Sequence, residues 1–213
     1  MNEVAEFLYK WQPLAGAVLG GLFGVVAALV VAYKARRQED LAAGMLLIGN
    51  LVTFQSAKRT LEQLLAEKEV KKENVPYWYA EKLARRRLQL SPVFEASRVR
   101  LMPVDTHLAV HLELFQLIVL DIDSRLDRLE ADIRAHDATE RTNRKPEALR
   151  ADARIIYQGF QSAVAHAACA ERILTYRVLS KYPTFNQIRR RFFPSKQDRA
   201  CEDLLIDKSK DGQ

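Results

Sequence analysis

The feature that most constrains this chain is an uncharged apolar run near its N-terminus, from Leu14 to Ala32. Its nineteen residues nearly match the ~20 that a helix needs to cross the ~30 Å hydrocarbon core of a bilayer. Trp11 and Tyr33 bracket the run, and aromatic residues are enriched at the two interfaces of a membrane. The sequence therefore predicts a transmembrane helix over residues 11–33, after a short extracytoplasmic tail over residues 1–10.

A cleaved export signal is the alternative, because Val30 and Ala32 offer small residues ahead of a cleavage point. The stretch before the run argues against it, since Glu3 and Glu6 outnumber the single Lys10 there. The apolar run also exceeds the 7–15 residues of a signal-peptide core. An uncleaved anchor is therefore favoured.

Basic residues follow the run directly, namely Lys34, Arg36 and Arg37. By the positive-inside rule they place the C-terminal part of the chain in the cytoplasm and the N-terminus outside. Together with Trp11 and Tyr33, these three form the expected membrane-interface residues.

Small residues recur at every fourth position of the run, and they are Gly16, Gly20, Gly24, Ala28 and Ala32. Such a stripe lets a second helix approach closely, so that van der Waals contact drives association in lipid. Gly and Ala are also common in membrane helices in general. The register favours packing, and self-association or docking to another protein's span would fit it equally well.

The rest of the chain has the composition of an all-α protein. It holds eight glycines and seven prolines among 213 residues, and half of the glycines lie within residues 16–24. Long stretches without either residue favour helices. We expect a cytoplasmic helical domain over residues 34–182 and a basic C-terminal tail with short helices over residues 183–213. We expect a long first helix that frays near Lys71, a second helix over residues 77–90, and a short third helix that ends at Arg100.

Two apolar seams with alternating spacings of four and three follow, which is the pattern of a coiled-coil face. The first is Leu108, Leu112, Phe115, Val119, Ile122, Leu126, Leu129 and Ile133, and the second is Leu149, Ala153, Ile156, Phe160, Ala163, Ala167, Ala170 and Leu174. A short polar turn lies between them, and Pro146 suits the first turn of the second helix. The pattern predicts a soluble helical bundle with an antiparallel coiled-coil hairpin over about 104–181, with an intermolecular coiled coil as the alternative.

Residues with catalytic or metal-binding chemistry are few. His107 and His111 lie one helical turn apart, a spacing that could hold a metal ion. A hairpin turning near Asn143 would place them opposite residues 175–179, and would place His166 opposite residues 117–120, so no third ligand is expected. The sequence contains no phosphate-binding glycine loop, HExxH or CxxC motif. We therefore expect no cofactor and no enzyme, and an enzyme with a dispersed polar site is the least favoured alternative.

The C-terminal tail carries a basic-aromatic patch, in which Arg189, Arg190 and Arg191 precede Phe192 and Phe193. The arginines would suit anionic lipid headgroups, and nucleic acid is a less economical partner for a tethered protein. A solvated helix end whose two rings pack into the bundle is an equal alternative.

Cys169 and Cys201 are too few for a disulfide scaffold. They are expected to be unpaired thiols, as in a reducing compartment.

The opening segment "WQPLAGAVLGGLFGVVAALVVAYKARR", ahead of a helical domain, resembles the N-terminus of many uncharacterised single-pass inner-membrane proteins of Gram-negative bacteria and their prophages. The resemblance implies a bacterial inner membrane and no particular activity. The function expected is that of a membrane-anchored scaffold, which tethers a cytoplasmic partner or self-associates. The alternative is an accessory subunit of a multi-component membrane complex, docked through the glycine stripe.

Overall fold

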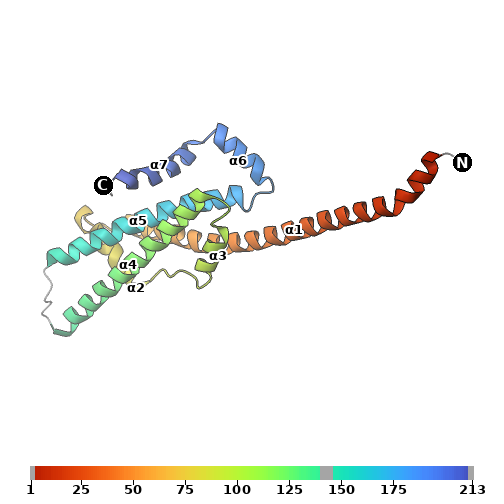
Figure 1. The fold of residues 1–213 in the computed structure, drawn as a ribbon. Coiled ribbons are helices and arrows are strands. Elements are labelled where there is room, and N and C mark those ends of the chain that lie inside the picture. Colours follow the sequence, from red (N-terminus) through yellow and green to blue (C-terminus); the bar gives the residue numbers. More distant parts are fainter. Residues whose placement is uncertain (1–2, 140–145, 211–213) are drawn as a thin grey trace. The chain divides into compact units, whose positions relative to one another are not determined.

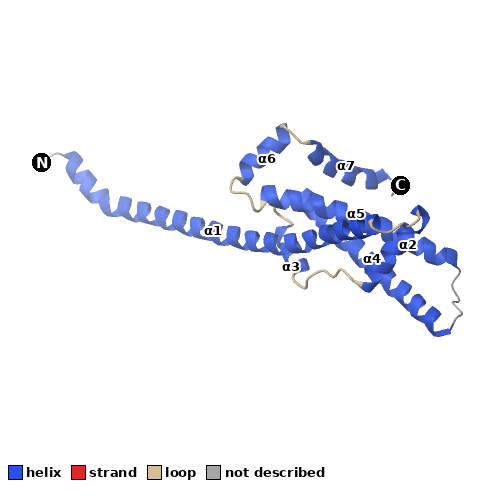
Figure 2. Cartoon of the chain, turned by 180° about the vertical axis from the view of Figure 1, so that it is seen from behind, coloured by secondary structure: helices blue, strands red, loops and turns tan. Residues whose placement is uncertain are grey.

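The computed structural model describes residues 3–139 and 146–210 of the chain (Figure 1). These residues form helices and loops without a strand (Figure 2), so the expected all-α class is confirmed. The elements are α1 (Glu3–Ala66), the 3₁₀ turn η1 (Lys72–Asn74), α2 (Val75–Arg85), α3 (Phe94–Leu101), α4 (Thr106–Thr139), α5 (Pro146–Arg177), α6 (Pro183–Phe192) and α7 (Lys196–Lys210). Internal contacts divide the chain into two units, Met1–Ala42 and Ala43–Gln213.

The first unit is the N-terminal part of α1. From residue 16 to residue 36 every side chain in it is exposed. The helix starts at Glu3 without a break at Pro13, which lies ten residues into it. The second unit holds the hydrophobic core.

The core of the second unit is built around α4 and α5, whose contact is the most extensive between any two helices. The two predicted seams are its buried faces: apart from Leu149, which is partly buried, and Ile133, whose side chain lies outside the described residues, every seam residue is buried. The helices are antiparallel, since Ile122 of α4 packs at Gly159 of α5 while Asp105 pairs with Arg177. A coiled-coil supertwist stays a prediction.

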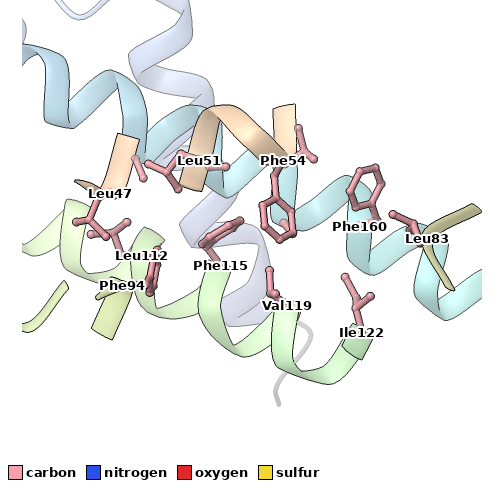
Figure 3. Close-up of a cluster of buried hydrophobic side chains, with 14 of the residues drawn as sticks. Leu47, Leu51, Phe54, Leu83, Phe94, Leu112, Phe115, Val119, Ile122 and Phe160 are labelled. Carbon is pink, nitrogen blue, oxygen red and sulfur yellow. The ribbon is translucent and has the colours of Figure 1, made fainter. Parts of the chain in front are cut away.

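The C-terminal part of α1 closes the core on one side. Figure 3 shows side chains from α1, α2 and α3 converging on α4 and α5. Phe54 of α1 meets Phe115 of α4 edge to face, with the ring centroids 5.0 Å apart. A Cβ atom at Gly44 would lie 3.0 Å from Cγ1 of Val178, which is tighter than an ordinary contact. Glycine therefore lets α1 approach the end of α5 without displacing Val178.

The second helix is shorter than expected, because α2 ends at Arg85 and not at Leu90. Tertiary contacts outweigh helix propensity in the segment that follows. Leu88 and Leu90 alternate inward as partly buried residues, and the backbone N–H of Ser91 donates to Oδ1 of Asn50 at 2.8 Å. Arg87 contacts three carboxylates, those of Asp123, Asp127 and Glu130 on α4. The segment 86–92 is therefore held in an irregular conformation across the α4 surface.

Local sequence sets the starts of α4 and α5. Asp105 caps α4, because its Oδ1 accepts the backbone N–H of Leu108 at 3.0 Å. Pro146 is the first residue of α5, a position where its missing N–H costs nothing.

Candidate membrane-contact and interaction surfaces

The apolar part of α1 is long and apolar enough to cross a membrane. Its most apolar window has a mean hydropathy of 2.2, and none of that window is buried. Large side chains such as Phe23 and Val31 are 68% and 67% exposed, values that a core helix would not show. The expected interface residues Trp11, Tyr33, Lys34 and Arg36 are also exposed, and Arg37 is half-buried.

The glycine stripe lies on this exposed helix. A Cβ atom built at Gly16, Gly20 or Gly24 would meet no atom of the described chain within 4 Å. Ala28 and Ala32 are likewise exposed. The stripe is therefore available to a second helix.

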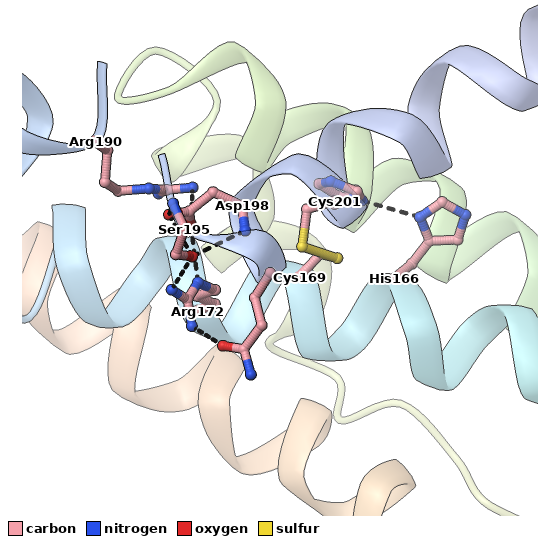
Figure 4. The surroundings of a disulfide bond; sticks show 9 residues. His166, Cys169, Arg172, Arg190, Ser195, Asp198 and Cys201 are labelled. Carbon is pink, nitrogen blue, oxygen red and sulfur yellow. Dashed lines mark hydrogen bonds and ion pairs between the residues drawn. A yellow bond between two sulfur atoms is a disulfide. The ribbon is translucent and has the colours of Figure 1, made fainter. Parts of the chain in front are cut away.

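Cys169 and Cys201 form a disulfide that joins α5 to α7, with their Cα atoms 5.6 Å apart (Figure 4). The expectation of two unpaired thiols was wrong. Cys169 lies on the face of α5 that α7 covers, and both cysteines are buried. Nothing in the local sequence signals that α7 folds back onto α5, which is why residue spacing alone missed the pairing.

A second set of contacts holds α7 beside the disulfide, and Asp198 is its centre. The side chain of Asp198 is 4% exposed. Its Oδ1 accepts a hydrogen bond from Nε of Arg172 at 2.9 Å and forms an ion pair with Nη2 of Arg190 at 2.8 Å. Its Oδ2 accepts the backbone N–H of Ser195 at 3.0 Å, while the N–H of Asp198 donates back to Oγ of Ser195. This is the reciprocal capping box of a helix N-terminus.

The environment of Asp198 favours its charged form. Burial by itself would raise the pKa of this carboxyl, but the hydrogen bonds from Arg172 and Ser195 outweigh it. The pKa of Asp198 is therefore lowered to about 2. We call Asp198, Arg172, Arg190 and Ser195 the Asp198 cluster.

On the other side of the disulfide lies a buried histidine pair, as Figure 4 shows for His166. Nδ1 of His111 on α4 and Nδ1 of His166 on α5 are 2.9 Å apart, and the two residues are 1% and 0% exposed. One Nδ1 must donate and the other accept, which requires both rings to be neutral or only one to be charged. Burial disfavours the charged imidazole, with His107 adding to the effect, and lowers the pKa of His111 to about 4. Asp105 and the backbone of Cys201 act in the opposite direction.

The histidine pair corrects the expected register of the hairpin. His111 faces His166 and not residues 175–179. The expected register assumed equal numbers of residues on either side of a turn centred near Asn143. The observed register instead follows the packing of large α4 residues against small ones on α5, such as Ile122 at Gly159. His107 is exposed and does not join His111 at a common site. Among the described residues, no group of three or more His, Cys, Asp or Glu side chains could hold a metal ion.

The basic-aromatic patch lies on α6, where the two rings are not packed into the bundle. Phe192 is 70% and Phe193 79% exposed. Of the three arginines, Arg189 is exposed and Arg190 points to the Asp198 cluster. The side chain of Arg191 lies outside the described residues.

An open groove of about 510 Å³ lies where η1 and α2 meet the start of α5. It is lined by aromatic residues and by both signs of charge, including Trp78, Glu81 and Arg154. Neither His107 nor His111 lines it. The groove shows no arrangement that would favour one class of ligand.

No protein-family model, curated protein or solved structure matches this chain. The features that bear on function are therefore the chain's own surfaces, namely the exposed apolar helix and the basic-aromatic side of α6.

Proposed function

We propose that this chain is a membrane-anchored helical interaction protein, which holds a cytoplasmic partner or a second copy of itself at a bacterial inner membrane. The observation that supports it best is the apolar part of α1, where residues 16–36 are all exposed. Apolar surface left in water costs roughly 25 cal/mol per Å², and a bilayer removes that cost. A helical domain fixed to such an anchor acts by raising local concentration, without chemistry of its own.

Affinity purification of the full-length protein from detergent-solubilised membranes tests the proposal. We expect recovery of a partner protein or of a second copy of the chain, identified by mass spectrometry and by the mass of the complex. A protein that is recovered alone and monomeric, before and after crosslinking in intact cells, would contradict it.

A second candidate function is that of an accessory subunit docked to a multi-span membrane protein. The open space at Gly20 and Gly24 favours it, because bulk added there would block a close helix contact. The double variant Gly20→Ile, Gly24→Ile is then expected to lose the multi-span partner. Leu22→Phe, Val26→Phe is the matched control, since it adds bulk on the opposite side of the same helix. Equal loss in both variants would argue against docking through the stripe.

The orientation is proposed from Lys34, Arg36 and Arg37, which favour a cytoplasmic helical domain. The disulfide favours the opposite side, because disulfides persist in oxidising compartments and are rare in the cytoplasm. A reporter that is active only outside the membrane, fused after Gln213, decides between the two: it should be inactive, and activity would reverse the orientation.

A further inference from the structure

Helix α6 carries an exposed apolar face. Phe185, Ile188 and Phe192 follow one another at helical spacings of three and four, and they are 65%, 54% and 70% exposed. Tyr182 precedes the helix and Phe193 follows it, and these two rings are 69% and 79% exposed. We call these five residues the aromatic face. Single exposed apolar residues are ordinary, but several at helical spacing on one side of a helix favour a contact surface.

The opposite side of α6 is fixed to the helical domain, so the aromatic face has a set direction. Nδ2 of Asn186 donates to Oγ of Ser180 at 2.7 Å. Arg190 pairs with Asp198 and lies over the ring of Tyr176, 5.9 Å from its centroid. The helix therefore presents its rings outward as a preformed surface, and no ordering of a free segment is needed on binding.

The segment that carries the aromatic face is rich in basic residues. The segment 181–199 contains one acid, Asp198, and six basic residues, which are Lys181, Arg189, Arg190, Arg191, Lys196 and Arg199. The single carboxylate, Asp198, is buried and already bound by Arg172 and Arg190. Lys181, Arg189, Lys196 and Arg199 are exposed. The surface is thus complementary to a dense anionic partner.

A small cleft of about 120 Å³ lies beside α6. Arg172, Arg189 and Arg190 line it, together with Asn186, Ser195 and the carboxylate of Asp198. Arg172 and Arg190 already pair with Asp198, so Arg189 is the arginine that a phosphate would meet. Guanidinium groups and short polar side chains are the groups that bind phosphate oxygens. The cleft therefore offers the guanidinium of Arg189 to a phosphate, next to rings that would lie in apolar surroundings.

We propose that α6 is an interfacial helix that binds anionic phospholipid, with the aromatic face in the headgroup–acyl boundary and Arg189 on a lipid phosphate. Aromatic rings interleaved with basic side chains are typical of helices that lie in a membrane interface, and Arg189, on the exposed side, can extend its guanidinium to the headgroups. A lipid surface is favoured over a protein because the same chain carries the anchor segment, so this proposal rests on the membrane anchoring proposed above. Anionic lipids add attraction for each basic residue near the surface.

The test uses the full-length protein in lipid nanodiscs, with the photoreactive amino acid p-benzoylphenylalanine placed at Phe192. Nanodiscs of neutral phosphatidylcholine are compared with nanodiscs that also contain phosphatidylglycerol, and crosslinked lipid is detected by mass spectrometry. We expect lipid adducts at Phe192, more of them with phosphatidylglycerol, and about tenfold fewer in Arg189→Glu, which reverses one surface charge. The same probe at Leu120 of α4, which is 54% exposed, is the control for random collision with lipid.

A second pair of variants keeps the test independent of the probe. Phe185→Ser, Ile188→Ser removes apolar area from α6, and Leu117→Ser, Leu120→Ser removes similar exposed area from α4 at the same spacing. In the unmodified protein we expect amide hydrogen exchange in α6 to be slower in anionic nanodiscs than in neutral ones. Only the α6 variant should abolish this difference. Adducts at Phe192 no more frequent than at Leu120, or crosslinks from Phe192 to a second copy of the chain, would overturn the proposal. Failure of the protein to enter nanodiscs at all would instead refute the anchoring.

Discussion

Asp198 shows how much one residue can decide in this molecule. It completes the capping box of α7 with Ser195 and pairs with arginines on α5 and α6. Because it is almost fully buried, water cannot solvate its charge if a partner is lost. Removing one member of a buried ion pair leaves the other uncompensated, which usually costs more than the pair contributes. The same carboxylate is absent from the sequence-based expectations, because a lone Asp in a polar tail carries no signal of burial.

Replacing Asp198 by Asn is expected to lower the free energy of unfolding by about 2–4 kcal/mol. The loss should be visible in urea unfolding and as earlier proteolysis between α6 and α7. Asp203→Asn, on the exposed side of α7, is the matched control and should change neither. The pKa of Asp198 is lower in the folded state than in the unfolded chain, so its contribution is complete above about pH 4 and fades as the pH falls towards 2. Equal stability of both variants would contradict this role.

His111 gives the fold a different pH dependence. Its folded pKa of about 4 lies below its ordinary value of 6.5, so the unfolded chain takes up the proton first. Stability should be complete above pH 6.5 and decline as the pH falls to 4, by roughly 3 kcal/mol in total. Thermal unfolding at a series of pH values measures the decline. The groups that face His111 are His166 on α5, His107 and Asp105 near the start of α4, and the backbone of Cys201 on α7.

Two variants separate His111 from the other titrating groups. His111→Asn should lower stability at neutral pH but flatten its decline between pH 6.5 and 4. His107→Gln, at an exposed position, should leave most of the decline in place. A melting temperature of the unmodified protein that stays constant across this range would contradict the buried neutral pair.

At the scale of elements, the sequence was informative where helices bury a regular face. The seam from Leu108 to Leu129 and the seam from Ala153 to Leu174 became the core because alternate spacings of four and three return side chains to one side of a helix. It was misleading after α2, where Arg87 and Ser91 are held by groups distant in sequence. Periodicity cannot show such contacts, because it reads only neighbours along one helix.

The C-terminal helix illustrates the same limit. The disulfide and the Asp198 cluster join α7 to α5 across long stretches of chain, 32 residues in the case of the two cysteines. The basic-aromatic patch was visible in the sequence, but which arginine turns inward was not: Arg190 does, and Arg189 stays exposed. Side-chain direction on a short helix is decided by its tertiary partners.

Opening the disulfide should loosen α7 and leave the α4–α5 core intact. A cross-link that closes a loop of this length contributes roughly 3–4 kcal/mol by the chain-entropy relation. Cys201→Ser is expected to lower stability by that order and to raise hydrogen exchange in α7 without raising it in α5. Reduction of the unmodified protein should produce the same pattern. Uniform loss of protection in α5 and α7 would show instead that the two helices unfold as one unit.

At the scale of the whole molecule, the chain combines an apolar helix whose residues 16–36 are all exposed with a domain that buries its own core. The first property follows from composition alone, since an uncharged apolar run of nineteen residues is typical of a transmembrane helix. The second follows from the seams. The sequence could not show which surfaces stay exposed after folding. Two such surfaces support the proposed functions, namely the open glycine stripe and the aromatic face of α6.

The most direct test of the central claim is extraction of membranes from cells that express the full chain, first with high salt and then with alkaline carbonate. The unmodified protein is predicted to stay in the membrane pellet through both washes. Leu22→Asp, Val26→Asp should move it to the supernatant, because a carboxylate in the hydrocarbon core costs about 2.5–3.5 kcal/mol, whereas Leu117→Asp, Leu120→Asp on α4 should not. Recovery of the unmodified protein in the carbonate supernatant would contradict membrane anchoring, and with it the proposed function.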